Sequence, residues 1–288
     1  MSEPNFISNS PIAIIGLGLM GGSLGLALRD HCRSLLGCDI DPVALDAAHQ
    51  LNTFSKLSSD PARVLPEAEV VILATPIDVI LDLLKRLPEI HLGSPIVLDL
   101  GSTKTDVVQA MENLPSRFDP LGGHPMCGKE VTGIENAEMD LFQGAAFAFT
   151  PLERTSEAAR SVAEQLAIRI GAHPLWIDPK THDKWSAATS HLPYLVASAL
   201  AGSTPAEAKP LASSGLRSTT RVASTPASIM LHVLATNQEN ILDQLDKFKH
   251  LLDHFEGLLS AGDYDALRTA LDESAQKRRE LTASEEDE

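Results

Sequence analysis

The chain has 288 residues, 43% of them hydrophobic, so it can bury a substantial core, and typical domain sizes predict two domains. Its formal net charge of −16 would repel nucleic acid and anionic membrane surfaces, so neither is an expected partner. No apolar run reaches the roughly 20 residues that span a bilayer, and no membrane association is expected.

Short apolar runs in the first half of the chain alternate with helical patterns. Buried strands are predicted at 12–15, 35–38, 70–74 and 96–100, with crossover helices at 20–29 and 77–87. Two further strands, 145–149 and 174–177, flank a helical stretch at 156–171. This alternation is typical of a Rossmann-type α/β fold, a doubly wound parallel sheet.

After Asp178-Pro179 the pattern is helical, which predicts a Rossmann domain at 1–178 and an all-α domain at 179–288. The longest predicted helix begins at Thr225-Pro226, with Thr225 as N-cap and Pro226 at the first helical position. With Asn237 counted in the series, its apolar stripe has a mean step of about 3.6 residues and predicts a buried face that also forms a homodimer. The stripe comprises Met230, Leu234, Ile241, Leu245, Phe248, Leu252, Phe255 and Leu259. The acidic segment 284–288 is predicted to be disordered.

Cysteine usage and the N-terminal segment bear on the cellular compartment. The three cysteines, Cys32, Cys38 and Cys127, are an odd number without the spacing of metal ligands. The segment MSEPNFISNS is polar and has neither the charged nor the apolar region of a signal peptide. These features predict a cytoplasmic protein without a metal site.

A glycine-rich turn, GLGLMG, follows the first predicted strand and opens a helix. In this context Gly16 allows the tight turn, Gly18 lets a pyrophosphate approach the backbone, and Gly21 lets helix and strand pack closely. Leu19 and Met20 lie in the first helical turn, whose free N–H groups suit phosphate. The motif predicts a dinucleotide site.

The second strand ends at Asp39, 18 residues after Gly21, where an acidic side chain binds the adenosine ribose. A carboxylate there favours NAD and would repel the additional phosphate of NADP. Thr75 and Pro76 end the next strand at the ligand-binding edge of such a sheet, so they are expected to border the cofactor.

His124 lies in the segment GGHPMCGKE, where glycine and proline restrict the backbone. An imidazole can take a proton as an alcohol is oxidised, although a histidine can equally cap a turn. Ser102 follows the strand 96–100, where it could meet substrate or cap a helix starting at residue 103.

Further polar side chains occur in the helical half. His191 lies on an otherwise apolar helix, where a lone histidine is more often a satisfied core residue. Arg217 and Arg221 are four residues apart and could grip a carboxylate, or could be two surface arginines.

The ordered segments GLGLMGGSL, DLGSTK, GGHPMCGKEVTG, THDKWSAATSHLPY and GLRSTTRVA resemble the prephenate and arogenate dehydrogenases of tyrosine biosynthesis. The resemblance extends from about residue 12 to 240. It implies NAD-dependent oxidative decarboxylation of a small-molecule substrate, with a dimerising helical domain and a site between the domains. It also implies that His124 bonds the ring hydroxyl, that Ser102 orients it, and that Arg221 binds a substrate carboxylate.

By the same resemblance, Glu130 and His191 line the site, and Arg217 matches the pattern without a defined role. Cys127 stands where relatives commonly have alanine, so it is interpreted as packing. Tyr194 replaces a second histidine found in many members, and Met230-Leu231 replaces a tryptophan-arginine pair. Both changes lie near the substrate side chain, which favours arogenate over prephenate.

Two alternatives remain open at this point. A β-hydroxyacid dehydrogenase would share the GLGxMG opening but use a lysine, for which Lys104 is the candidate. A non-catalytic, NAD-binding regulatory protein would need only the nucleotide site, and would leave His124, Ser102 and Arg221 unexplained.

Overall fold

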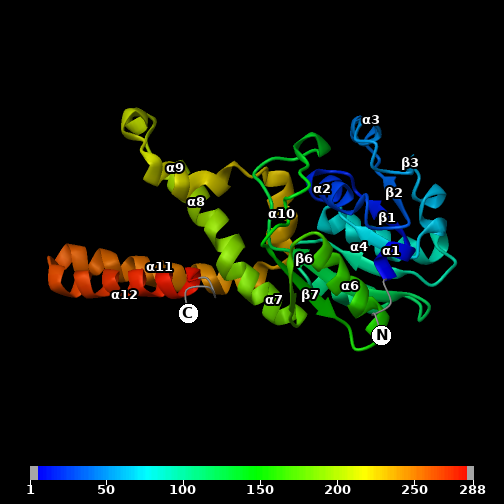
Figure 1. Cartoon of the computed structure of the whole chain (residues 1–288). Helices are drawn as coiled ribbons and strands as arrows, with labels where there is room; N and C mark the ends of the chain where they lie inside the picture. Colours follow the sequence, from blue (N-terminus) through cyan, green and yellow to red (C-terminus); the bar gives the residue numbers. More distant parts are fainter. Residues whose placement is uncertain (1–5, 284–288) are drawn as a thin grey trace. The chain divides into compact units, whose positions relative to one another are not determined.

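The computed structural model describes residues 6–283 (Figure 1). The segment 284–288, predicted to be disordered, lies outside the described residues, as does the start of the polar N-terminal segment. The chain divides into two compact units, Met1–Gln238 and Glu239–Glu288. Within the described residues, no helix combines the length and apolar character needed to cross a membrane.

In the described part of the first unit, eight strands form one sheet in the order β3-β2-β1-β4-β5-β6-β7-β8. All neighbouring strands are parallel except β6 and β7, which are antiparallel. The order reverses between β1 and β4, as in a doubly wound fold. The strands are β1 Pro11–Ile15, β2 Ser34–Cys38, β3 Lys56–Ser58, β4 Val70–Leu73, β5 Ile96–Asp99, β6 Asp119–Pro125, β7 Ala146–Pro151 and β8 His173–Trp176.

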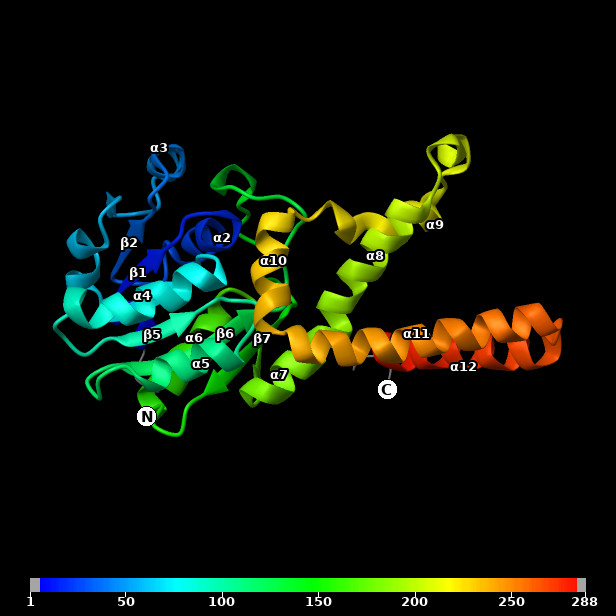
Figure 2. The ribbon, with the colours of Figure 1, turned by 180° about the vertical axis from the view of Figure 1, so that it is seen from behind.

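Helices cover both faces of this sheet (Figures 1 and 2). The helices α1 Phe6–Asn9, α2 Leu19–Leu28 and α6 Glu157–Arg169 contribute to one hydrophobic core, and α4 Ile77–Ile90 and α5 Thr105–Glu112 to the other. In α4 the buried residues are Ile77, Ile80, Leu83, Leu84 and Leu87. Their spacing of three and four residues makes one apolar face, so the helix buries that face and leaves the other to solvent. The predicted Rossmann-type fold is confirmed.

The sheet differs from the expected one in two respects. The strands β3 and β6 were not predicted, because β3 is short and half-buried and because β6 contains two glycines and two prolines that weaken strand propensity. The pair β6 and β7 breaks the expected all-parallel arrangement. As a result, His124 lies on a strand rather than in a turn.

Helices follow the sheet in the rest of the first unit. They are α7 Pro179–Ser186, a π-helical turn η4 Ala187–His191, α8 Leu192–Ser203, η5 Ala206–Leu211, α9 Ser214–Thr220, η6 Arg221–Ser224 and α10 Ala227–Thr236. Asp178 caps α7 by accepting a hydrogen bond from the Thr181 amide. Residues of α8 contact α9 and η6, and α10 contacts α4 (Figure 2).

The long helix expected from Thr225-Pro226 is interrupted. Pro226, not Thr225, is the N-cap of α10, without a side-chain capping bond, and the helix ends at Thr236. Helix α11, Gln238–Ala261, begins after Asn237, whose φ of −128° and ψ of 26° are not helical. The Asn237 side chain is buried and donates to the Asp183 carbonyl at 2.7 Å, so the interruption accompanies an inward polar contact.

The second unit is an antiparallel pair, α11 and α12 Tyr264–Thr282, which lie side by side in Figures 1 and 2. Gly262 joins them with a φ of +66°, and Asp263 caps α12 by accepting from the Ala266 amide. The predicted buried stripe is only partly buried, because Leu252 and Leu259 are 49% and 56% exposed in the single chain.

The first-unit turn between β1 and α2 offers a matched pair of substitutions. A methyl group at Gly21 would lie 1.9 Å from the Gly16 carbonyl oxygen, whereas one at Gly18 would meet nothing within 4 Å. We expect Gly21→Ala to lower the free energy of unfolding by about 1–3 kcal/mol, because the backbone must move. Gly18→Ala should change it by less than about 1 kcal/mol. Urea unfolding measures both values, and equal losses would contradict this account of the turn.

Candidate active site

The glycine-rich turn lies between β1 and α2. Gly16 has a φ of +94°, which L side chains rarely adopt. Gly18 is the N-cap of α2 and provides no side-chain capping bond, while the space beside its Cα is open. Leu19 and Met20 form the start of the helix, where N–H groups lack partners within the helix. This turn could therefore hold a phosphate.

Asp39 follows β2 and lies beside the same turn. Its carboxylate accepts from the Leu17 amide at 2.6 Å and from the Asp41 amide at 2.9 Å. Thr75, after β4, is also adjacent, because its methyl group would lie 2.7 Å from a Cβ placed on Gly16. Pro76 is exposed and is the N-cap of α4. The structure thus brings together most of the predicted cofactor residues.

Two glycines make room for His124 on β6. A methyl group on Gly122 would lie 2.1 Å from the Thr150 hydroxyl oxygen, and one on Gly123 would lie 2.8 Å from the Asp99 carbonyl oxygen. The glycines therefore allow close contact with the neighbouring strands. His124 itself is half-buried, and its Nδ1 lies 3.0 Å from Nε2 of His182. The alternative that His124 caps a turn was wrong.

His182 and Asp183 of α7 were not predicted as site residues. His182 is buried, and its Nδ1 lies 2.9 Å from an Asp183 carboxylate oxygen. The same carboxylate accepts from the amides of Lys104 at 2.7 Å and Thr105 at 2.8 Å. The sequence signal was weak, because one adjacent histidine and aspartate on a predicted helix do not reveal their distant partners.

Ser102 lies in the segment between β5 and α5 and is half-buried. The expected helix start at residue 103 was wrong, because α5 begins at Thr105 with Lys104 as N-cap. Asp183 satisfies the first amides of α5, so Ser102 is not the cap. Since β5 and β6 are parallel neighbours, their carboxyl ends place Ser102 and His124 at the same edge of the sheet.

His191 lies in the π-helical turn and is 1% exposed. Its Nδ1 is 3.1 Å from Nδ2 of Asn237, while its Nε2 has no hydrogen-bond partner within residues 6–283. The interpretation of a satisfied core histidine is therefore wrong for one ring nitrogen. Tyr194 lies one turn further along α8 and is half-buried.

The buried charges shift the pKa values of this cluster. Burial lowers the pKa of His124 well below its usual range, and charge on His182, Lys104 and His191 lowers it further. Burial alone would raise the pKa of Asp183, but hydrogen bonds from His182, Thr105 and Lys104 together lower it. His124 is therefore neutral near pH 7, and Asp183 is a carboxylate.

Glu130 and Arg221 form an ion pair that joins the segment after β6 to η6. Arg221 remains largely exposed, with 63% of its side chain accessible, so its guanidinium can reach a further anion. Arg217 is exposed on α9, one turn earlier. Both arginines are exposed, as the alternative of two surface arginines expects. Arg221, however, forms an ion pair with the predicted site residue Glu130.

Lys104 is fully enclosed, with none of its side chain exposed. Its ammonium forms an ion pair with Asp99 and donates to the Gly123 carbonyl at 2.7 Å. It therefore braces β5 against β6. The β-hydroxyacid dehydrogenase alternative requires a lysine that reaches a ligand, and Lys104 does not. Cys127 packs against the core as expected, and burial raises the pKa of its thiol to about 11.

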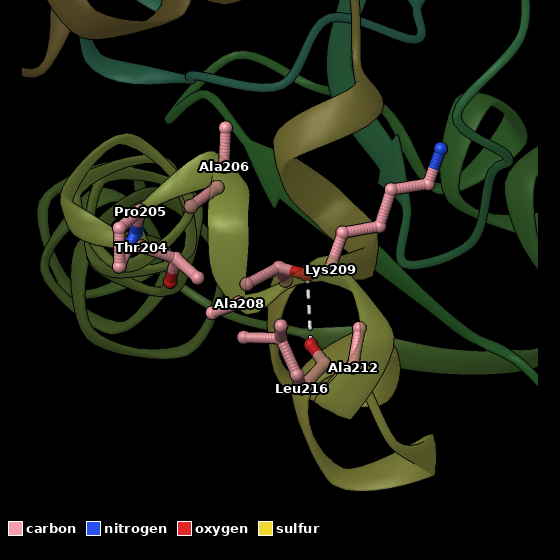
Figure 3. Close-up of a pocket in the computed structure, with 9 residues that line it drawn as sticks. Thr204, Pro205, Ala206, Ala208, Lys209, Ala212 and Leu216 are labelled. Atoms are coloured by element: carbon pink, nitrogen blue, oxygen red, sulfur yellow. Dashed lines mark hydrogen bonds between the residues drawn. The ribbon is translucent and has the colours of Figure 1, made fainter.

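A surface pocket of about 340 Å³ lies between the end of α8, η5 and α9 (Figure 3). Small apolar residues dominate its lining, among them Ala201, Ala206, Ala208, Ala212 and Leu216. The Lys209 side chain extends away from the other labelled residues, and none of the predicted site residues lines the pocket. No group of three or more potential metal ligands occurs in the part of the chain that the structure describes.

Burial, the largest cause, lowers the pKa of His191 from 6.5 to about 4. As the pH falls below 6.5, the unfolded chain therefore takes up a proton on this ring before the folded chain does. We expect the free energy of unfolding to decrease by on the order of 3 kcal/mol between pH 6.5 and 4 because of His191. Urea unfolding gives the free energy of unfolding of the wild type and of His191→Gln at each pH, and each value is compared with that of the same protein at pH 8. The difference between the two proteins isolates the contribution of His191. An unchanged pH dependence in the variant would refute it.

Comparison with known proteins identifies the family. The model described as "Prephenate dehydrogenase, nucleotide-binding domain" matches residues 24–175, and "Prephenate dehydrogenase, dimerization domain" matches residues 178–273. Prephenate dehydrogenase of Bacillus subtilis is 31% identical over 266 residues, which cover 89% of this chain and 72% of that protein.

Two solved structures are also similar. Prephenate dehydrogenase from Aquifex aeolicus, in complex with hydroxyphenyl propionate and NAD+, has a TM-score of 0.87 and 27% identity, covering 98% of this chain and 100% of that one. Synechocystis arogenate dehydrogenase has a TM-score of 0.80 and 29% identity, covering 94% and 100%. With both family models matching along most of its length, the chain belongs to the prephenate dehydrogenase family of oxidoreductases.

Proposed function

We propose that this protein catalyses the NAD-dependent oxidative decarboxylation of a cyclohexadienol dicarboxylate, with arogenate preferred over prephenate. One observation carries the proposal: a neutral, half-buried His124 lies at the sheet edge that also carries the glycine-rich turn. Because β1, β2, β4, β5 and β6 are parallel, their carboxyl ends share this edge, where such folds bind nucleotides. A base and a hydride acceptor can therefore act on one carbon.

The chemistry requires little from the protein beyond positioning and one base. NAD+, when bound, supplies the acceptor for the hydride from C4 of the ring. His124 takes the proton of the C4 hydroxyl, so that carbon becomes a carbonyl. The electrons of the bond to the ring carboxylate then enter the ring, carbon dioxide leaves, and an aromatic phenol results. Alignment and general-base catalysis of ordinary size account for the reaction without a metal.

The remaining candidates have roles in binding. Ser102 would orient the substrate hydroxyl beside His124. Arg221, held by Glu130 yet largely exposed, would bind a substrate carboxylate in the bidentate manner of guanidinium groups. His191 would donate from its unpartnered Nε2. Arg217 would add positive charge near the site, which a chain of net charge −16 needs for a substrate with two carboxylates.

Arogenate and prephenate differ in the side chain, which carries an amine in arogenate and a ketone in prephenate. Tyr194 replaces the second histidine of many relatives, and Met230-Leu231 replaces a tryptophan-arginine pair. Met230 packs against the core and Leu231 is exposed, so neither provides a polar group for the keto acid. These losses support a preference for arogenate.

The substrate preference is tested by following NADH formation with arogenate and prephenate in parallel. We expect the higher kcat/KM with arogenate, and we expect Tyr194→His to shift the ratio toward prephenate by about tenfold, the worth of one added hydrogen bond to a charged ligand. Tyr194→Phe serves as the matched control, because it keeps the ring and adds no donor for the keto acid. A higher specificity constant for prephenate in the wild type would overturn the preference.

We also infer a preference for NAD over NADP, supported by the carboxylate of Asp39 beside the turn. Asp39→Asn keeps the shape and removes the charge, so the ratio of kcat/KM for NAD to that for NADP should fall by roughly tenfold. Asp41→Asn is the control, since Asp41 caps α3 Pro42–Gln50 two residues away and should not change the ratio. A ratio unaltered in Asp39→Asn counts against a role for this charge.

The assembly and compartment are proposed on separate grounds. A homodimer formed by the helical region is supported by the description of the matching family model and by exposed leucines on α11. The domain boundary near residue 178 stays a prediction; the two family models meet there. Cys32, Cys38 and Cys127 are free thiols, which supports a reducing, cytoplasmic location.

A further inference from the structure

We infer that Asp183 and Asn237 set opposite tautomers on two histidines of the site, so that Nε2 of His124 is unprotonated and Nε2 of His191 carries the proton. In this arrangement His182 and Asn237 are positioning residues, because they act through the rings that meet the substrate. The inference deepens the proposed function, since it rests on His124 as the base and on His191 as a ligand donor.

The first tautomer follows from a chain of hydrogen bonds that begins at a carboxylate. An ionised carboxylate can only accept, so the 2.9 Å contact with Asp183 requires a proton on Nδ1 of His182. In the singly protonated His182 ring, Nε2 carries the lone pair. His124 lies 3.0 Å away through its Nδ1, which must donate. A neutral His124 therefore carries its lone pair on Nε2, the atom left for the substrate hydroxyl.

Asp183 is held in place as an acceptor, so the hydrogen bonds from His124 through His182 to Asp183 have only one direction. Its carboxylate accepts the Lys104 and Thr105 amides at 2.7 and 2.8 Å, and it is 1% exposed. The first amides of a helix carry partial positive charge and favour the ionised carboxyl. An ionised, immobile Asp183 cannot donate to His182, so the reverse tautomer of His182 is excluded.

The second tautomer follows from a backbone carbonyl. The Asp183 carbonyl oxygen can only accept, so the Asn237 atom 2.7 Å away is the amide nitrogen. The same nitrogen is 3.1 Å from Nδ1 of His191 and uses its other proton there. His191 therefore accepts at Nδ1 and carries its proton on Nε2. That Nε2–H is buried and without a partner among the described residues, which suits a ligand oxygen.

The two tautomers have complementary consequences for the reaction. When His124 Nε2 takes the hydroxyl proton, the ring becomes a cation whose Nδ1–H points at His182, with the Asp183 charge behind it. The arrangement is that of a carboxylate that orients a catalytic imidazole and stabilises its protonated form, extended by one ring. His191 stays a neutral donor, because burial lowers its pKa to about 4. Asp183 thus determines both tautomers. Its carboxylate makes Nε2 of His124 an acceptor through His182, and its backbone carbonyl makes Nε2 of His191 a donor through Asn237.

The tautomers are read directly from long-range ¹⁵N–¹H correlation spectra of protein labelled in histidine. The chain has 10 histidines, and the spectra of His124→Ala and His191→Ala identify the two rings. We expect a protonated Nδ1 on His124 and a protonated Nε2 on His191. The opposite tautomer on either ring overturns the inference for that ring, whatever the enzyme's activity.

Kinetics of matched variants test the positioning roles. His182→Phe removes the acceptor and should lower kcat by about 100-fold with little change in KM, while His182→Gln, whose amide oxygen can accept from Nδ1, should recover most of it. Asn237→Asp replaces the donor by an acceptor, so it should invert the His191 tautomer and raise KM about tenfold. Thr103→Val, which removes only the 2.8 Å hydrogen bond to Thr236, should retain the wild-type kinetics and His124 tautomer.

The outcomes separate this inference from the proposed function. A wild type that turns over neither arogenate nor prephenate refutes the function, and the spectra still decide the tautomers. An active wild type, with His182→Phe equal to it in both kcat and tautomer, refutes the positioning role. If His182→Phe fails to fold, the wild-type spectrum decides the tautomers, and a folded His182→Gln that loses the kcat of the wild type refutes the acceptor role.

Discussion

The arrangement of the site depends on the buried carboxylate of Asp183. It accepts the first amides of α5 and the ring proton of His182, so one side chain caps a helix of the Rossmann region and orients a ring that contacts β6. A buried carboxylate is tolerated only where hydrogen bonds replace its lost hydration, and Asp183 has three. Two of those bonds join helix α7 to the start of α5, and His182 in turn contacts His124 on β6, so fold and candidate site share one set of contacts.

The sheet and its helices could be predicted because their signals are local. The strand β4 is a run of apolar residues, and α4 places Ile77, Ile80 and Leu84 on one face. The strand β6 was missed because Gly122 and Gly123 have low strand propensity, and they are tolerated only because close packing against β5 and β7 requires them. The interruption at Asn237 was missed because its apolar neighbours keep the helical period while its own contacts lie at Asp183 and His191.

The candidate site was predictable where a motif carries it and unpredictable where contacts alone define it. His124, Ser102 and the glycines of the turn stand in recognisable segments. His182, Asp183 and Asn237 do not, because each acquires its role from a residue far along the chain: Asp183 from Lys104 and Thr105, and Asn237 from Asp183. Lys104 shows the opposite case: it was the catalytic candidate of the β-hydroxyacid dehydrogenase alternative, whereas its complete burial against Asp99 indicates a structural brace.

The π-helical turn at Ala187–His191 sets the rotational phase between α7 and α8. The Leu192 amide bonds the Ala187 carbonyl, five residues back, so the turn contains one residue more than a regular helix. Deleting that residue would rotate everything beyond it by about 100°, the angle per residue of an α-helix. His191 and Tyr194 would then turn away from their present positions relative to α7, while the helix itself remained intact. The extra residue therefore determines which side chains of α8 lie on the same face as His191. A sequence alignment that removes it would match residues on different faces of the helix.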